Sequence, residues 1–505
     1  MEDSLLKRYK SKFSTNTISL VISSILTLLI PKFLGPAGYG NFNFLNSFFS
    51  KILGFLSLGT PLAFFTKLSQ RQNEYKLIRI YIIFLFSILV FTIVSIIVIY
   101  LTDYDSILFV KIPYNFVLLA FVYSFLLFLV EIVRKINDAL AFTYFSENTF
   151  VISRILILIL IALFIYLEIF NLLIYYYILI LGFSILLIVW FYYLSKNEVK
   201  PLNIKYKLDN KSFKGYFSEF YIYSSPLFIV GIFALISGFG ERWILQYYGG
   251  SIEQGYYSFS YAFASIIFLF TGSMSPLFTR EFSIAWINKD FIQMRKLYNK
   301  IIPLLIIVAT YLSFFVVFNS NTIVKLILGD SYADAAIIIS IMALYPIHQT
   351  YGQLLGSIIY GSGNTKFARN VSVPCDVLGL FATLILLLPN DSGGFEMSSV
   401  GLAYKMVIFQ IIVVNIYLYY CTNLLKISFW NSLKFQLIII FSFAFLAFIN
   451  HKLSINITDS DVFQLFINFI TYSISCILFF ILFPSLIPLT KNDYTSFKNT
   501  LNLKK

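Results

Sequence analysis

The sequence predicts an all-α polytopic membrane protein with about 14 membrane-spanning helices. Of its 505 residues, 59% are hydrophobic and only 12% are charged. The mean hydropathy of +0.83 is far above that of a soluble domain. Long apolar runs recur along the whole chain, and the lysines and arginines between them alternate in number from one connector to the next. These observations place the chain in a lipid bilayer.

Each apolar run is long enough to cross the hydrocarbon core as a helix, where every backbone N–H and C=O must be satisfied within the segment. The fourteen runs lie at 14–31, 41–66, 78–101, 115–133, 148–168, 170–194, 217–246, 256–279, 300–320, 336–361, 367–389, 398–421, 433–450 and 462–488. No small-residue cleavage site follows the first run, so we interpret it as a retained helix rather than a signal peptide.

The basic residues predict the orientation, because lysine and arginine accumulate in cytoplasmic loops. With the N-terminus inside, the cytoplasmic segments hold 29 of them, whereas the opposite side holds only Lys32, Lys111, Lys325 and Lys452. Both termini are therefore expected in the cytoplasm. The net charge of +13 is accounted for by this topology and by anionic lipid headgroups, so no nucleic-acid partner is expected.

A glycine-rich turn separates the first two runs, and a similar turn separates the seventh and eighth. The turns read Phe33-Leu34-Gly35-Pro36-Ala37-Gly38-Tyr39-Gly40 and Tyr248-Gly249-Gly250-Ser251-Ile252-Glu253-Gln254-Gly255. Gly35 and Gly250 are 215 residues apart, as are Pro61 and Pro276, while Gly38 and Gly255 are 217 apart, which suggests a two-residue slip. Six helices separate the copies, so both point the same way. We expect two six-helix lobes in a parallel pseudo-twofold repeat, with two helices appended at the C-terminus.

The predicted domain boundaries follow from this repeat. Residues 1–195 form the N-lobe with helices 1–6, and residues 196–215 form a basic cytoplasmic linker with six lysines. Residues 216–425 form the C-lobe with helices 7–12, and residues 426–505 hold helices 13 and 14 and a cytoplasmic tail.

Charged side chains inside the apolar runs are the candidate functional residues, because such charges usually face a wet interior or a partner. Lys51 lies near the middle of its run, too deep to reach the headgroups easily, whereas Arg242 and Arg154 lie closer to the interfaces and have alternative snorkelling or structural roles. A second set is Asp376, Lys405 and Glu241. Asp376 and Lys405, on consecutive helices, are expected either to pair structurally or to couple transport to an ion. Glu241 is adjacent to Arg242 and does not face it on a helix.

Two further motifs resemble a known family. They are Tyr360-Gly361-Ser362-Gly363-Asn364-Thr365-Lys366, between two runs, and Gly393-Gly394 followed by Val400-Gly401-Leu402-Ala403-Tyr404. Together with the first glycine turn, the helix count and the lobe spacing, they make the chain similar to the Wzx-type polysaccharide flippases. This polysaccharide transporter family belongs to the multidrug/oligosaccharidyl-lipid/polysaccharide exporter superfamily.

The resemblance implies two six-helix bundles around a central cavity and a flippase rather than an enzyme. Its substrate would be a polyprenyl-diphosphate-linked oligosaccharide repeat unit, moved by alternating access to the outer leaflet of the bacterial inner membrane for O-antigen, lipopolysaccharide or related surface polysaccharide biosynthesis. Lys51, Arg242 and Arg154 would hold the diphosphate and acidic sugars. A polysaccharide polymerase and chain-length proteins are expected partners beside the lipid bilayer. No cofactor is expected, and a proton or sodium gradient is a candidate energy source.

Two other classes of function stay open. A cation-coupled multidrug extruder of the same superfamily needs deep acidic residues, and the N-lobe offers Glu131 and Glu168 only near helix ends. A membrane glycosyltransferase or polymerase normally has a large outer loop with catalytic side chains, and the expected outer connectors are short.

Overall fold

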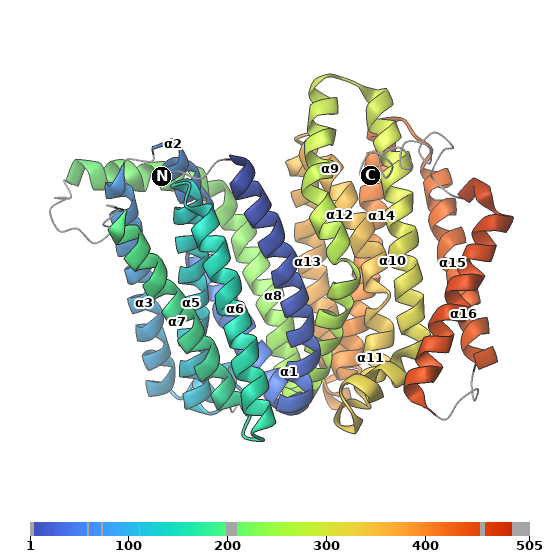
Figure 1. Cartoon of the computed structure of the whole chain (residues 1–505), viewed down its shortest axis with the longest axis horizontal. Helices are drawn as coiled ribbons and strands as arrows, with labels where there is room; N and C mark the ends of the chain where they lie inside the picture. The colour runs from blue at the N-terminus through green and yellow to red at the C-terminus, as the bar shows by residue number, and fades with distance from the viewer. Residues whose placement is uncertain are drawn as a thin grey trace. The chain divides into compact units, whose positions relative to one another are not determined.

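The protein is described from a computed structural model over residues 5–57, 60–71, 74–110, 112–197, 210–454 and 460–486. All regular structure in these ranges is helical, which confirms the predicted fold class (Figure 1). The α-helices are α1 (Leu5–Leu56), α2 (Thr60–Gln70), α3 (Tyr75–Leu101), α4 (Asp105–Leu108), α5 (Tyr114–Ala139), α6 (Thr143–Tyr166), α7 (Leu172–Lys196), α8 (Asn210–Ile267), α9 (Leu269–Ile287), α10 (Phe291–Ile327), α11 (Ala335–Met342), α12 (Tyr345–Gly361), α13 (Thr365–Leu387), α14 (Ser398–Leu425), α15 (Phe429–Ser454) and α16 (Asp461–Leu482). Three short 3₁₀ helices are η1 (Asp330–Tyr332), η2 (Asn390–Ser392) and η3 (Pro484–Leu486).

Ten helices within the described ranges are long and apolar enough to cross a membrane. All fourteen predicted runs are mainly helical. The first run and most of the second lie in α1, on either side of the break at Gly35. The seventh run and half of the eighth lie in α8, and the tenth is divided between α11 and α12.

Each glycine turn is a sharp break between two helical segments, and α1 and α8 each contain both segments. Gly35 interrupts α1 with φ 67° and ψ 169°, and Gly250 interrupts α8 with φ 78° and ψ −175°. A positive φ is a conformation that glycine adopts without a steric penalty. In α1 the next residue is Pro36, whose missing N–H is tolerated where a helical segment begins. The two glycines therefore adopt similar backbone angles at positions 215 residues apart.

Contacts divide the chain into two compact units. The first unit contains residues 1–258 and 383–398, and the second contains residues 259–382 and 399–505. The predicted lobe boundaries at 195, 215 and 425 stay predictions, and most of the basic linker at 196–215 lies outside the described residues.

In the first unit, α1 packs on α5 and α6, and α7 packs on both α5 and α6 (Figure 1). An aromatic cluster joins α1, α5 and α7, where the ring of Phe42 lies 4.8 Å from Tyr175 and 5.4 Å from Tyr176, centroid to centroid. By contrast, α3 leaves large apolar side chains such as Phe86 and Phe91 exposed. An exposed apolar face of this kind is suited to lipid rather than water.

In the second unit, α12 packs on α9 and α10, and α15 packs on α10 and α16. The two predicted C-terminal helices are α15 and α16. Helix α16 is held to α10 by stacked rings of Tyr311 and Tyr472, with centroids 5.1 Å apart, and by Asn468, which donates to Asn319 Oδ1 at 2.8 Å. Such amide contacts are favourable between helices in hydrocarbon.

Candidate functional site

Lys51 lies in the second half of α1, against the first half of α8. Its ammonium group lies over Gly238, where an added methyl group would be only 2.7 Å from Nζ. Nearby, the rings of Phe48 and Phe239 meet edge-on with centroids 5.0 Å apart, so the two helices run antiparallel here. Because Gly238 has no side chain, the ammonium group of Lys51 can lie directly against the backbone of α8.

Arg242 follows Gly238 by one turn of α8 and lies on the same face of that helix. One turn corresponds to a rise of about 6 Å. Its Nη1 donates to Ser258 Oγ at 2.9 Å, and its guanidinium carbon lies 4.5 Å from the ring centroid of Tyr257, within cation–π range. Both of these partners follow the kink in α8. The structure therefore places both leading cations beside the segment of α8 that precedes the kink, with Lys51 at Gly238 and Arg242 four residues further along.

Arg154 lies at the interface of α6 with α1. Its Nη2 donates to Ser23 Oγ at 2.7 Å, in the half of α1 that precedes Gly35. Within the described residues its buried Nε has no hydrogen-bond partner. Its guanidinium carbon lies 6.0 Å from the ring centroid of Phe150. Arg154 is thus held by a different part of α1 from the part that carries Lys51.

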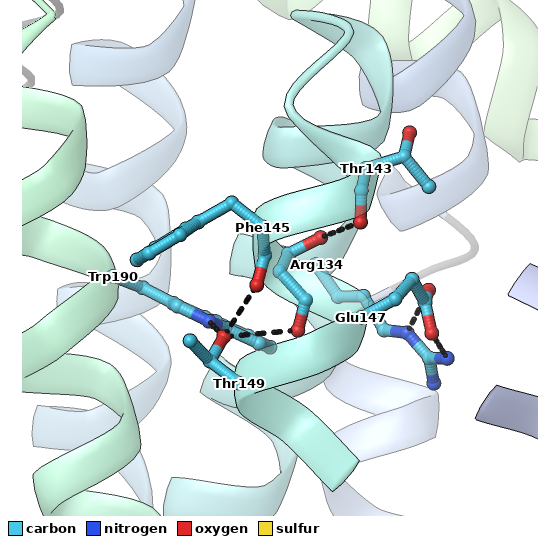
Figure 2. A network of polar contacts seen from close by, with 7 residues as sticks. Arg134, Thr143, Phe145, Glu147, Thr149 and Trp190 are labelled. Atoms are coloured by element: carbon cyan, nitrogen blue, oxygen red, sulfur yellow. Dashed lines mark hydrogen bonds and ion pairs between the residues drawn. The ribbon is translucent and has the colours of Figure 1, made fainter. Parts of the chain in front are cut away.

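A buried ion pair between Arg134 and Glu147 was not predicted (Figure 2). Arg134 Nε and Nη2 donate to the two carboxylate oxygens of Glu147 at 2.8 and 2.5 Å, and Glu147 is completely buried. The helices α5 and α6 are joined by this bidentate contact. Next to it, Trp190 Nε1 donates to Thr149 Oγ1 at 2.7 Å and links α7 to the same region (Figure 2).

The two kinked segments contact each other through two glycines. A methyl group on Gly40 would overlap the carbonyl oxygen of Ser251, and one on Gly255 would overlap the carbonyl oxygen of Pro36. Gly40 and Gly255 are 215 residues apart, and so are Pro36 and Ser251. The contact is therefore reciprocal between the two copies.

This contact corrects the alignment of the repeat. Gly255 is equivalent to Gly40 and not to Gly38, so the proposed two-residue slip is wrong and a single offset of 215 residues holds through the turn. The polar contact beside it is asymmetric, since Ser251 Oγ donates to Asn41 Oδ1 at 2.6 Å.

The second set of predicted residues lies in two places. Lys405 on α14 is buried, and its ammonium group lies on α13, where a methyl group on Gly379 would be 3.1 Å from Nζ. Asp376 is three residues before Gly379 and therefore on the same face of α13. Glu241 is half-buried on α8, about 100° around the helix from Arg242. The roles of all three stay predictions.

A cavity of about 360 Å³ lies within the first unit, between the end of α1, the start of α2 and the middle of α5. Its polar lining residues are Ser50, Ser57, Ser124, Glu131 and Lys135. Glu131 and Lys135 are one helical turn apart on α5, so the carboxylate has a cation on the same face. The sequence predicted only that Glu131 lies near the end of a helix, and it did not predict that Glu131 lines a cavity.

These helices form a multi-pass fold, in which ten helices of the described ranges are long and apolar enough to cross a membrane. The chain is similar to a lipid II flippase MurJ in an inward closed conformation, with 16% identity over 94% of this chain and 99% of that one and a TM-score of 0.64. It is also similar to an inward-facing multidrug resistance MATE family transporter of the MOP superfamily, with 14% identity over 84% and 99% of the two chains and a TM-score of 0.61. An outward-facing MATE family transporter matches with a TM-score of 0.50 and 15% identity over 83% and 95%.

No protein-family model matches the chain, and no curated protein matches it. Identities of this size define the fold alone. The chain thus has the fold of the MOP-superfamily transporters, and its Wzx-type specificity is a matter for proposal.

Proposed function

We propose that the protein is a flippase that moves a polyprenyl-diphosphate-linked oligosaccharide from the inner to the outer leaflet of a bacterial inner membrane. The observation that carries this proposal is the placement of Lys51 and Arg242 along one face of α8. A diphosphate that leaves water needs compensation from more than one charged donor, and Lys51 and Arg242 are two such donors beside the same segment of α8.

The two side chains have complementary properties for this task. Arg242 presents a planar guanidinium whose Nη1 is oriented by Ser258, and such a fork matches phosphate oxygens. Lys51 is a compact charge on a flexible stem, exposed in the first unit. Arg154 is the third candidate, and its contact with Ser23 favours a role in orienting α1 on α6.

In this mechanism the lobes alternate between inward-open and outward-open states while the cations hold the diphosphate and the lipid tail stays in the bilayer. The likeness to the lipid II flippase MurJ supports a lipid-linked substrate. A polysaccharide polymerase and chain-length proteins would use the exported unit, and a proton or sodium gradient would drive the cycle.

The test is a flipping assay in proteoliposomes with a fluorescent polyprenyl-diphosphate disaccharide. We expect Lys51→Ala and Arg242→Ala each to slow flipping at least about tenfold, since each removes a charge-assisted contact worth roughly 1.5–3 kcal/mol. Lys51→Arg should retain more activity than Lys51→Ala because it keeps the charge.

Arg280→Ala is the matched control, because Arg280 is an exposed cation whose Nη1 donates to the neighbouring Glu281. It should flip at the normal rate. Normal flipping by the Lys51→Ala/Arg242→Ala double variant would overturn the assignment.

A cation-coupled multidrug extruder is the second candidate, and it is favoured by the carboxylate of Glu131 in the cavity of the first unit. A carboxylate in such a position would bind a proton, a sodium ion or a cationic drug. Lys135 on the same face reduces that attraction. Dye efflux from cells that express the protein, abolished by Glu131→Gln, would favour this candidate over the flippase.

A further inference from the structure

A second cavity lies wholly within the second unit. It has a volume of about 340 Å³ and is bounded by α9, α12 and α14. Its lining residues carry no charge, and eight of the twelve bear a hydroxyl or a carboxamide. This lining differs from that of the first unit's cavity, which includes Glu131 and Lys135.

Two lining amides, Gln349 and Gln410, are hydrogen-bonded to each other, and Tyr345 supports them from outside the cavity lining. Gln410 Nε2 on α14 donates to Gln349 Oε1 on α12 at 2.8 Å, and Tyr345 Oη donates to the same oxygen at 3.1 Å. Because Gln349 accepts through its oxygen, its two N–H groups are left for another acceptor. Gly352 makes room for the network, since a methyl group there would lie 3.0 Å from Gln410 Nε2.

The same face of α12 continues with an acceptor and hydroxyl groups. Gln353 Oε1 is buried and has no hydrogen-bond partner within the described residues, although Gln353 lines the cavity. Ser275 and Ser357 share a hydrogen bond of 2.9 Å across α9 and α12. Tyr360, more than half exposed, adds an aromatic face at the rim. A buried acceptor without a donor is costly unless a ligand or water supplies one.

We propose that this cavity binds an uncharged, hydroxyl-rich group, namely a neutral glycosyl residue of the transported oligosaccharide. Carboxamides and hydroxyls both donate to and accept from sugar hydroxyls, whereas no lining cation balances an acidic sugar. The inference rests on the proposed flippase function and extends it to the substrate class. The diphosphate and the glycosyl group then have chemically distinct subsites.

The test measures binding of methyl β-D-glucopyranoside and of methyl β-D-glucuronide to the full chain in lipid nanodiscs by saturation-transfer NMR. We expect the neutral glycoside to bind and the glucuronide not to bind. Gln353→Leu should weaken binding of the neutral glycoside about three- to tenfold, as expected for one lost hydrogen bond. The variant breaks no protein hydrogen bond at Oε1, so it should fold normally.

Gln410→Leu is a second variant and should weaken binding by a similar factor. Asn415→Leu is the matched control, because Asn415 is also an amide on α14 but donates to Ile411 O of its own helix and does not line the cavity. Equal binding of both glycosides, or equal effects of Gln353→Leu and Asn415→Leu, would overturn the inference.

Failure of the flippase proposal has a different signature. If lipid-linked disaccharide is not flipped, the glycoside still binds to the purified chain and Gln353→Leu still weakens it. If flipping is normal and glycoside binding is insensitive to Gln353→Leu, the flippase proposal stands and the neutral subsite is wrong.

Discussion

Gly40→Ala tests whether the two kinked segments must meet during transport. The added methyl group would overlap the carbonyl oxygen of Ser251 and lie 2.8 Å from the backbone nitrogen of Gly255. Neither atom belongs to a flexible side chain, so relief requires the helices to separate. Non-bonded contacts between heavy atoms are normally at least about 3.5 Å, so the contact with the Gly255 nitrogen alone requires the two backbones to move apart by roughly 0.7 Å.

Overpacking of this size typically costs about 1–3 kcal/mol. The penalty applies only to the conformation in which α1 and α8 touch at these glycines. It therefore shifts the equilibrium away from that conformation by a factor of roughly 5 to 150. We expect flipping in proteoliposomes to slow by a comparable factor. Amide hydrogen exchange should rise in segment 36–42, because the two helices are held apart there.

Gly54→Ala is the matched control on the same helix, because a methyl group on Gly54 would meet nothing within 4 Å. It should change neither flipping nor exchange. If Gly40→Ala behaves like Gly54→Ala in both measurements, the close approach of the two segments is not part of the transport cycle and the reasoning is refuted.

Two further predictions concern single positions. Gly238→Ala would place a methyl group 2.7 Å from Lys51 Nζ, and the flexible lysine side chain can move aside while it keeps its charge, so flipping should fall less than in Lys51→Ala. Gly231→Ala, with nothing within 4 Å, should be normal in the same assay. Glu147→Gln would leave the guanidinium of Arg134 without its buried carboxylate and should destabilise the protein by about 3 kcal/mol. The loss would be measured as a lower unfolding temperature in detergent. An unchanged unfolding temperature would show that the ion pair contributes nothing to stability.

The fold class was predictable because the hydropathy signal of a membrane-spanning helix extends over the whole length of the helix. A membrane span needs about 20 apolar residues whatever their order, so composition identifies it without any tertiary information. The glycine turns were predicted at the right places, because a sharp break between two helical segments needs a residue that adopts a positive φ without strain. The backbone angles at Gly35 and Gly250 could not be predicted from the sequence.

The candidate site was predictable in part. Lys51 and Arg242 were found because a charge inside an apolar run is costly. Their placement beside the same segment of α8 depends on how α1 packs against α8, which involves the backbone contacts at Gly40 and Gly255 and is not encoded in hydropathy. The Arg134–Glu147 pair was missed for a physical reason. Only charges inside the apolar runs were taken as candidates. Arg134 was assigned to a cytoplasmic connector, and Glu147 lies one residue before the predicted run at 148–168, so neither was considered.

The reciprocal glycine contact bears on how the two halves of this chain diverged. Each glycine is fitted to a backbone carbonyl of the opposite copy, so a larger residue in one copy is not relieved by any side-chain change in the other. The polar contact between Asn41 and Ser251 has no mirror image, because the positions 215 residues away hold Tyr256 and Pro36. Gly40 and Gly255 are therefore the positions at which each copy limits the residues that the other can accept.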